Sequence, residues 1–141
     1  MDICVDFDGT CVSHEFPKMG KDIGAVPVLK KLIKSGHNII LFTMRGNNEG
    51  CTFSKHGEIV CQPGYFLQEA IDWFSENNIP LHGINENPDQ RCWTNSPKAY
   101  GQLYIDDNSL GCPLKHDSRV SEKPFVDWVS VEILLKSRGI L

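Results

Sequence analysis

The stretch Ile3-Cys4-Val5-Asp6-Phe7-Asp8-Gly9-Thr10 decides the fold. It begins with a short apolar run, which is typical of a strand buried on both faces of a parallel sheet. It then changes to acids and a glycine, which mark the turn where this strand ends. The pattern therefore predicts a buried strand whose carboxyl end carries polar side chains.

Apolar runs and helical patterns alternate along the rest of the chain. Further strands are predicted at 38–42, 81–84 and 103–105, and helices at 22–35, 65–77 and 126–138. In the first helix, for example, apolar residues recur at the i, i+3, i+4 and i+7 spacing of a helix packed on one face. This alternation predicts an α/β fold, namely a three-layer, Rossmann-like parallel sheet with helices on both faces.

The length of 141 residues is about the usual size of one domain, and we interpret residues 1–141 as a single domain. The stretch 46–64 holds four glycines among polar residues, which predicts a long loop or a small hairpin. This stretch is too short to form a core of its own. No separate cap domain is therefore expected.

Composition and charge restrict the class of protein. Hydrophobic residues make up 40% of the chain and charged residues 23%, which argues against disorder. A net charge of -4 disfavours a broadly basic surface, so nucleic acid is not the favoured partner. The N-terminal residues lack a signal-peptide pattern, and no apolar run approaches the ~20 residues of a membrane-spanning helix. We therefore expect a cytoplasmic protein that does not bind a membrane.

Six cysteines are present, and without an export signal they are expected to be reduced thiols. No two of them form a CxxC pair, so a zinc site has weak support. Cys51, His56, Cys61 and Cys92 could together surround a metal ion. Scattered thiols that pack in the fold are the favoured interpretation.

Polar side chains follow three of the predicted strands where each strand ends: Asp6 and Asp8, then Thr43, then Asp106 and Asp107. In an open parallel sheet, ligands bind beyond the carboxyl ends of the strands. Clustered carboxylates repel one another unless a cation joins them, and Mg2+ prefers such hard oxygen ligands. Each acid alone could be a solvated residue at a strand end, but four acids on two strands favour a magnesium site.

Asp6-Phe7-Asp8-Gly9-Thr10 after an apolar strand resembles the first motif of the haloacid dehalogenase (HAD) superfamily. Thr43 resembles its second motif, Lys98 its third, and Asp106-Asp107 its fourth. The resemblance covers residues 3–107 and looks most like the small hydrolases without a cap domain that phages and bacteria often encode. It implies a HAD-like fold.

The resemblance implies roles for the acids. Asp6 would be the nucleophile that forms an aspartyl-phosphate, and Asp8 would act as general acid and then as general base. Magnesium would be bound by Asp6, by the backbone carbonyl of Asp8 and by Asp106, with Asp107 in support.

The resemblance also implies contacts to the transferring phosphoryl group. Thr43 would donate its hydroxyl to a phosphoryl oxygen, and Lys98 would neutralise charge on the group. Because Lys98 lies only eight residues before Asp106, Lys55 is the substitute if Lys98 cannot reach.

Three other residues are assigned to substrate binding. Gly9 and Thr10 belong to the first motif and lie next to the acids. Arg45 could clamp a phosphate with two hydrogen bonds, and a solvated loop arginine is an equal alternative.

The implied function is magnesium-dependent hydrolysis of a phosphomonoester. An aspartate at position 8 favours phosphate esters over carbon–halogen or carbon–phosphorus bonds. Without a cap the site would be open. An open site suits a phosphorylated small molecule or macromolecule, or one wall supplied by a second subunit of a homo-oligomer.

Three alternatives stay open. A nucleic-acid 3′-end phosphatase similar to the phosphatase domain of polynucleotide kinase-phosphatase fits the motifs, although the acidic balance weighs against it. A phospho-acceptor domain similar to a response-regulator receiver uses the same residue types, but its acceptor lies on a middle strand. A HAD domain used only for binding is disfavoured, because every motif position is chemically competent.

Overall fold

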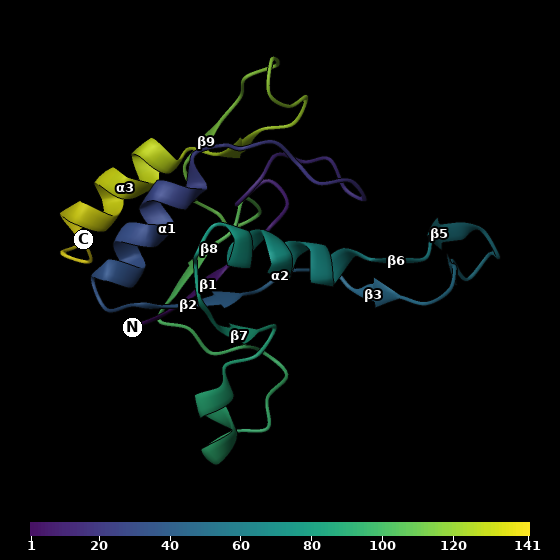
Figure 1. Ribbon diagram of the computed structural model, residues 1–141, viewed down its shortest axis with the longest axis horizontal. Coiled ribbons are helices and arrows are strands. Elements are labelled where there is room, and N and C mark those ends of the chain that lie inside the picture. Colours follow the sequence, from purple (N-terminus) through teal and green to yellow (C-terminus); the bar gives the residue numbers. More distant parts are fainter.

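The computed structural model describes the backbone of residues 1–141 and all side chains except those of Thr52 and Cys61. Four parallel strands form the central sheet in the spatial order β7-β2-β1-β8 (Figure 1). Their bounds are Asp2–Val5 (β1), Asn38–Leu41 (β2), Leu81–Ile84 (β7) and Leu103–Ile105 (β8). Because β1 lies between β2 and β8, its carboxyl end is flanked by the ends of both neighbours.

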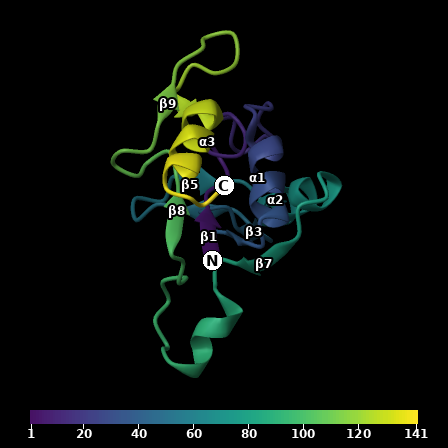
Figure 2. The same cartoon turned by 90° about the vertical axis from the view of Figure 1, so that its left-hand side faces the viewer.

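Three α-helices flank the sheet: α1 (Ala25–Lys34), α2 (Phe66–Glu76) and α3 (Trp128–Ser137). Helices α1 and α3 lie side by side (Figure 2), and Lys31 of α1 forms an ion pair of 2.7 Å with Glu132 of α3. Buried side chains of all three helices share one cluster with alternate strand residues such as Ile3 and Val5. The predicted α/β fold with a parallel sheet and flanking helices is therefore confirmed.

The opposite face of the sheet is covered differently. Here Cys4 and Ile40 pack against Ala99, with Phe42 and Tyr104 at the side. The covering segment, residues 85–102, contains the short 3-10 helix η1 (Pro88–Cys92) in place of an α-helix. Two prolines and many turn-forming residues in this segment end helices early, which explains the difference from the α-helical layer expected on this side.

Residues 46–64, for which the sequence predicts either a long loop or a small hairpin, form antiparallel strand pairs. Strand β3 (Asn47–Asn48) pairs with β6 (Gly64–Tyr65), and β4 (Thr52–Phe53) pairs with β5 (Ile59–Cys61). The hairpin projects away from the sheet beyond the N-terminal end of α2 (Figure 1). None of the described side chains of 49–63 belongs to a core cluster.

The C-terminal part of the chain holds the turn that follows β1. Strands β9 (Leu114–Lys115) and β10 (Phe125–Val126) form a short hairpin, and the N–H of Val126 in β10 donates to the carbonyl of Gly9 at 2.9 Å. The Trp128 indole N–H donates to the Thr10 carbonyl at 2.7 Å, and the indole is buried. The turn that carries the first motif is thus fixed from the far end of the chain.

Across the described residues, no helix has both the length and the apolar character needed to cross a bilayer.

Candidate functional site

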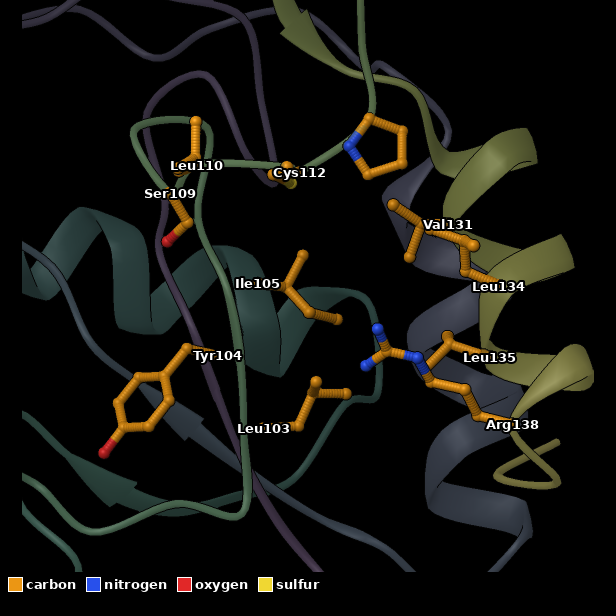
Figure 3. Close-up of a pocket in the computed structure, with 12 residues that line it drawn as sticks. Leu103, Tyr104, Ile105, Ser109, Leu110, Cys112, Val131, Leu134, Leu135 and Arg138 are labelled. Carbon is orange, nitrogen blue, oxygen red and sulfur yellow. The ribbon is translucent and has the colours of Figure 1, made fainter.

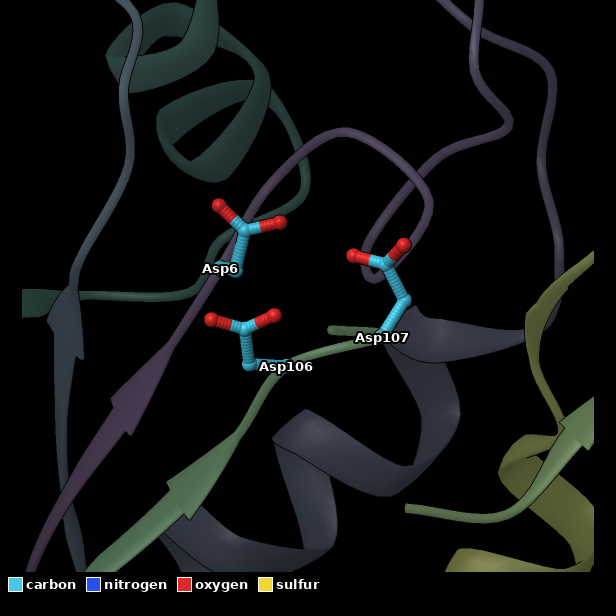
Figure 4. Close-up of side chains that lie close together, drawn as sticks. All are labelled: Asp6, Asp106 and Asp107. Carbon is cyan, nitrogen blue, oxygen red and sulfur yellow. The ribbon is translucent and has the colours of Figure 1, made fainter. Parts of the chain in front are cut away.

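Three carboxylates meet at the carboxyl edge of the sheet. Asp6, Asp106 and Asp107 each offer an oxygen, and these oxygens all lie within 4.8 Å of one another (Figure 4). The register of β1 and β8 brings these acids together. Val5 pairs with Ile105 at the ends of the two strands, so the residues that follow each strand begin at the same edge of the sheet. The N–H of Asp6 still donates to the Ile105 carbonyl at 3.0 Å. The strand ends predicted to share one edge therefore do so.

The electrostatics of this cluster favour a bound cation. Burial raises the pKa of Asp6 to about 7, against a lowering contribution from the Phe7 N–H, and the neighbouring acids Asp106, Asp107 and Asp8 raise it further. Burial also raises the pKa of Asp107, although His14 acts in the opposite direction. A divalent cation would offset this repulsion, and a ligand set of carboxylate oxygens alone fits a hard ion such as Mg2+. The cluster can thus hold a metal ion.

Thr10 connects the two motifs. Its hydroxyl accepts from the Asp107 N–H at 3.0 Å and lies 3.3 Å from an oxygen of both Asp6 and Asp107. The residue is fully buried. Within the protein its hydroxyl holds the acids in place, and the predicted contact of Thr10 with a substrate stays a prediction.

Gly9 is required by the turn itself. Its φ of +84° is a conformation that favours glycine, and a Cβ at this position would lie 2.1 Å from Nε2 of His14. Its N–H and carbonyl are both bonded within the protein, to Val12 and Val126 respectively. Gly9 lets the His14 ring approach the backbone, and its predicted contact with a substrate stays a prediction.

His14 also contacts the cluster and was not predicted from the sequence. Its Nε2 lies 3.1 Å from an Asp107 oxygen, and both side chains are largely buried. No motif or spacing marks this histidine. The sequence holds only an indirect signal for His14: Gly9 has no Cβ, so another side chain can pack directly against its backbone.

Asp106 and Asp107 differ in how far the protein already uses their oxygens. Asp107 is contacted at one oxygen by Thr10 and Asn108 and at the other by His14. The Asp106 carboxylate accepts one bond, from the Asn108 N–H at 2.7 Å. Asp106 thus keeps more unused lone pairs than Asp107, which fits it as a principal metal ligand with Asp107 in support.

Arg45 does not face the carboxylate cluster. Its Nε and Nη2 donate to the two oxygens of Asp8 at 2.7 and 2.8 Å, and Nη2 also donates to the Lys18 carbonyl at 2.9 Å. Nη1 lies 3.5 Å from the Phe66 carbonyl and from a Glu69 oxygen. The alternative of a solvated arginine is wrong, because the guanidinium is buried. The phosphate clamp stays a prediction, and the engagement of the Arg45 donors by the protein does not favour it.

Thr43 lies at the end of β2 with its hydroxyl proton available. The hydroxyl accepts from the Arg45 N–H at 3.2 Å, and the Thr43 N–H donates to Oδ1 of Asn85 at 2.8 Å. Since the hydroxyl is bonded as an acceptor, it can still donate to a ligand. Asn85, which follows β7, was not anticipated from the sequence.

The third-motif lysine stays a prediction. Lys98 is exposed, and its ammonium lies over the Tyr104 ring, 5.4 Å from the centroid. Lys55 lies in the turn at the tip of the 46–64 hairpin and is also exposed. In the described part of the chain, neither ammonium forms an ion pair with Asp6 or Asp106.

None of the described cysteine side chains joins the three aspartates as a possible metal ligand. Burial raises the pKa of Cys4 to about 11 and the pKa of Cys11 well above its usual range, which keeps both thiols protonated. Cys51 and Cys92 are exposed free thiols, and the side chain of Cys61 lies outside the described residues. Among the described side chains, the three aspartates are the one group of three or more acids, histidines or cysteines that comes together.

An apolar cavity lies on the other side of β8. It has a volume of about 200 Å³ and is formed between β8 and α3 (Figure 3). Its lining includes Leu103, Ile105, Cys112, Val131, Leu134 and Leu135. None of the described residues that line it is acidic, so it offers nothing to a hard cation.

No protein-family model matches the chain, and no curated protein matches it. The solved structure of a conserved protein coded by a locus from Bacteroides thetaiotaomicron is similar to it. The TM-score is 0.69 and the sequence identity 28%, over 98% of this chain and 91% of that chain. The described fold thus recurs in a protein for which no activity is stated, and the function has to be inferred from the site.

Proposed function

We propose that this protein is a magnesium-dependent phosphomonoester hydrolase of HAD type that forms an aspartyl-phosphate on Asp6. The observation that carries the proposal is the meeting of Asp6 with Asp106 and Asp107 at the carboxyl edge of the sheet. Thr43 supports it, because its free hydroxyl proton lies at the end of the neighbouring strand β2.

The reaction needs two displacements. In the first, an oxygen of Asp6 attacks phosphorus, the ester bond breaks, and Asp8 gives a proton to the departing alkoxide. In the second, Asp8 takes a proton from a water molecule, whose oxygen attacks phosphorus and releases inorganic phosphate. Asp6 is regenerated as a carboxylate.

Other residues hold the reacting groups. The hydroxyl of Thr43 donates to a phosphoryl oxygen, and Thr10 and His14 keep Asp107 beside Asp6. Asp6 and Asp106 would hold Mg2+, which would supply positive charge to stabilise the transferring phosphoryl group. Lys98, in the 85–102 segment, is the side-chain cation that we assign to the transferring phosphoryl group.

The substrate class is a phosphorylated small molecule or macromolecule. The test is a screen of phosphomonoesters, nucleotides and a 3′-phosphorylated oligonucleotide, with magnesium and with a chelator. We expect multiple turnovers that need magnesium. A preference for the oligonucleotide would favour the end-processing alternative, and a single stable phosphorylation without turnover would favour the receiver-like alternative.

Asp6→Asn is the decisive variant. The change is nearly isosteric and removes the nucleophilic charge, so we expect turnover to fall by at least about 10³-fold while the protein stays folded. Asp117→Asn, at a partly exposed acid of the 116–124 loop, is the matched control and should keep wild-type turnover. Wild-type turnover by Asp6→Asn would refute the proposed nucleophile.

A further inference from the structure

Arg45 is the one buried charged residue among the described side chains. Its side chain is 1% exposed, and that of its partner Asp8 is 19% exposed. A buried guanidinium is costly unless its donors are satisfied and its charge is paired. For Arg45 this cost arises directly beside the acid to which we assign proton transfer.

The guanidinium is held on every side. Its carbon lies 5.0 Å from the centroid of the Phe7 ring and 5.3 Å from that of Phe16. The Lys18 carbonyl fixes one edge, and the Phe66 carbonyl at the start of α2 faces another. Three segments of the chain thus contact the guanidinium of Arg45 and hold it in place.

The two bonds to Asp8 are the shortest that Arg45 makes. A bidentate pair of this kind fixes the plane of the carboxylate as well as its distance. Asp8 lies directly before the turn at residues 9–11 and could otherwise adopt several rotamers, since no other side chain among the described residues forms a hydrogen bond with its carboxylate. The orientation of Asp8 is therefore set by Arg45.

We propose that Arg45 is a positioning residue for Asp8, which holds the carboxyl group where it protonates the leaving-group oxygen and then deprotonates water. This inference rests on the proposed function. Arg45 acts through Asp8 and does not touch the phosphoryl group, because its Nε and Nη2 donate to Asp8 and Lys18 and its Nη1 faces Phe66 and Glu69.

The leaving group provides the test. An alkoxide departs only when it receives a proton, whereas para-nitrophenolate departs without one. Arg45→Lys keeps the charge but cannot form the bidentate pair. We expect it to lower kcat/KM for an alkyl phosphate by about 10²-fold, the scale of general-acid catalysis, and for para-nitrophenyl phosphate by less than about 10-fold, with similar KM values. Asp8→Asn should show the same dependence on the leaving group, more strongly.

Two further variants keep the test sharp. Arg119→Lys is the matched control, because Arg119 forms the same bidentate contact with Asp117 on the surface, and it should leave both rates unchanged. Phe16→Leu loosens the aromatic contact to Arg45 at a half-exposed position and serves if Arg45→Lys does not fold. It should reproduce the preferential loss with the alkyl phosphate, to a smaller extent.

Equal losses with both substrates would overturn the inference, because they would indicate a general loss of folded protein. A rise in KM for both substrates would overturn it in favour of direct phosphate binding by Arg45. If the wild type and Arg119→Lys both turn over, these outcomes concern Arg45 alone. If the wild type hydrolyses neither substrate with magnesium present, the proposed function and this inference both fail.

Discussion

At the scale of single residues, the hydroxyl of Thr10 connects the N–H of Asp107 with the carboxylates of Asp6 and Asp107. Thr10→Val keeps the shape of the side chain but leaves the Asp107 N–H without its partner. We expect a loss of about 1–3 kcal/mol in the free energy of unfolding, measured by urea denaturation, and weaker stabilisation by magnesium.

Thr10→Ser is the control for this prediction, because it keeps the hydroxyl and loses only a methyl group. Its loss of stability should be smaller, and its response to magnesium should resemble that of the wild type. An equal magnesium response in Thr10→Val and Thr10→Ser would contradict the assigned role of the hydroxyl.

Some site residues could be predicted from the sequence and others could not, for a physical reason. Asp6 and Asp106 each follow an apolar strand directly, so their place at the sheet edge depends on local pattern and parallel pairing alone. The pairing of Arg45 with Asp8, and that of His14 with Asp107, joins segments whose approach is set by tertiary packing. No periodicity encodes such contacts.

At the scale of elements, the 46–64 hairpin is separable from the core. Because its outer part contributes none of the described core side chains, replacing residues 50–62 with a short turn should change the free energy of unfolding by less than about 1 kcal/mol. The pairs of β3 with β6, which contact the start of α2, are kept. Urea denaturation of the shortened chain gives the measurement.

A loss of several kcal/mol would show that the hairpin supports the fold. The matched comparison is a deletion in the 116–124 loop, which also joins two short strands. Turnover of the shortened chain on small and large phosphate esters would then report whether the hairpin contacts substrates.

Helices and strands of the sheet were predictable because their apolar periodicity is strong. The segment 85–102 was not, because its course depends on a few specific bonds. Gln90 donates to the carbonyls of Ser96 and Lys98 and accepts from the Tyr100 N–H, so one side chain replaces the regular bonds of a helix. Helix and strand propensities do not predict side-chain bonds of this kind.

At the scale of the whole molecule, the acid cluster couples stability to pH. The pKa of Asp6 rises from 3.8 in the unfolded chain to about 7 in the folded protein. The folded state therefore holds the proton more tightly, and the stability of the metal-free protein falls as pH rises from about 4 to about 7. We expect a loss of roughly 1 to 4 kcal/mol across this window, measured by thermal or urea unfolding with a chelator present.

Magnesium should reverse most of this loss at pH 8, because its charge replaces that of the proton. In Asp6→Asn the fall with pH should be smaller, and the response to magnesium weaker. A wild-type slope in Asp6→Asn would assign the pH dependence to other groups. Calcium, which is larger, serves as the comparison for the size of the ion.

The parallel pairing of β1 with β8 also has a consequence for biosynthesis. Residue 6 leaves the ribosome about one hundred residues before residues 106 and 107, and its own strand cannot yet have the neighbour that completes the cluster. A nascent chain therefore carries Asp6 without Asp106 and Asp107. The acid cluster, and any metal site that it forms, is complete only after the edge strand β8 has been made and has docked beside β1.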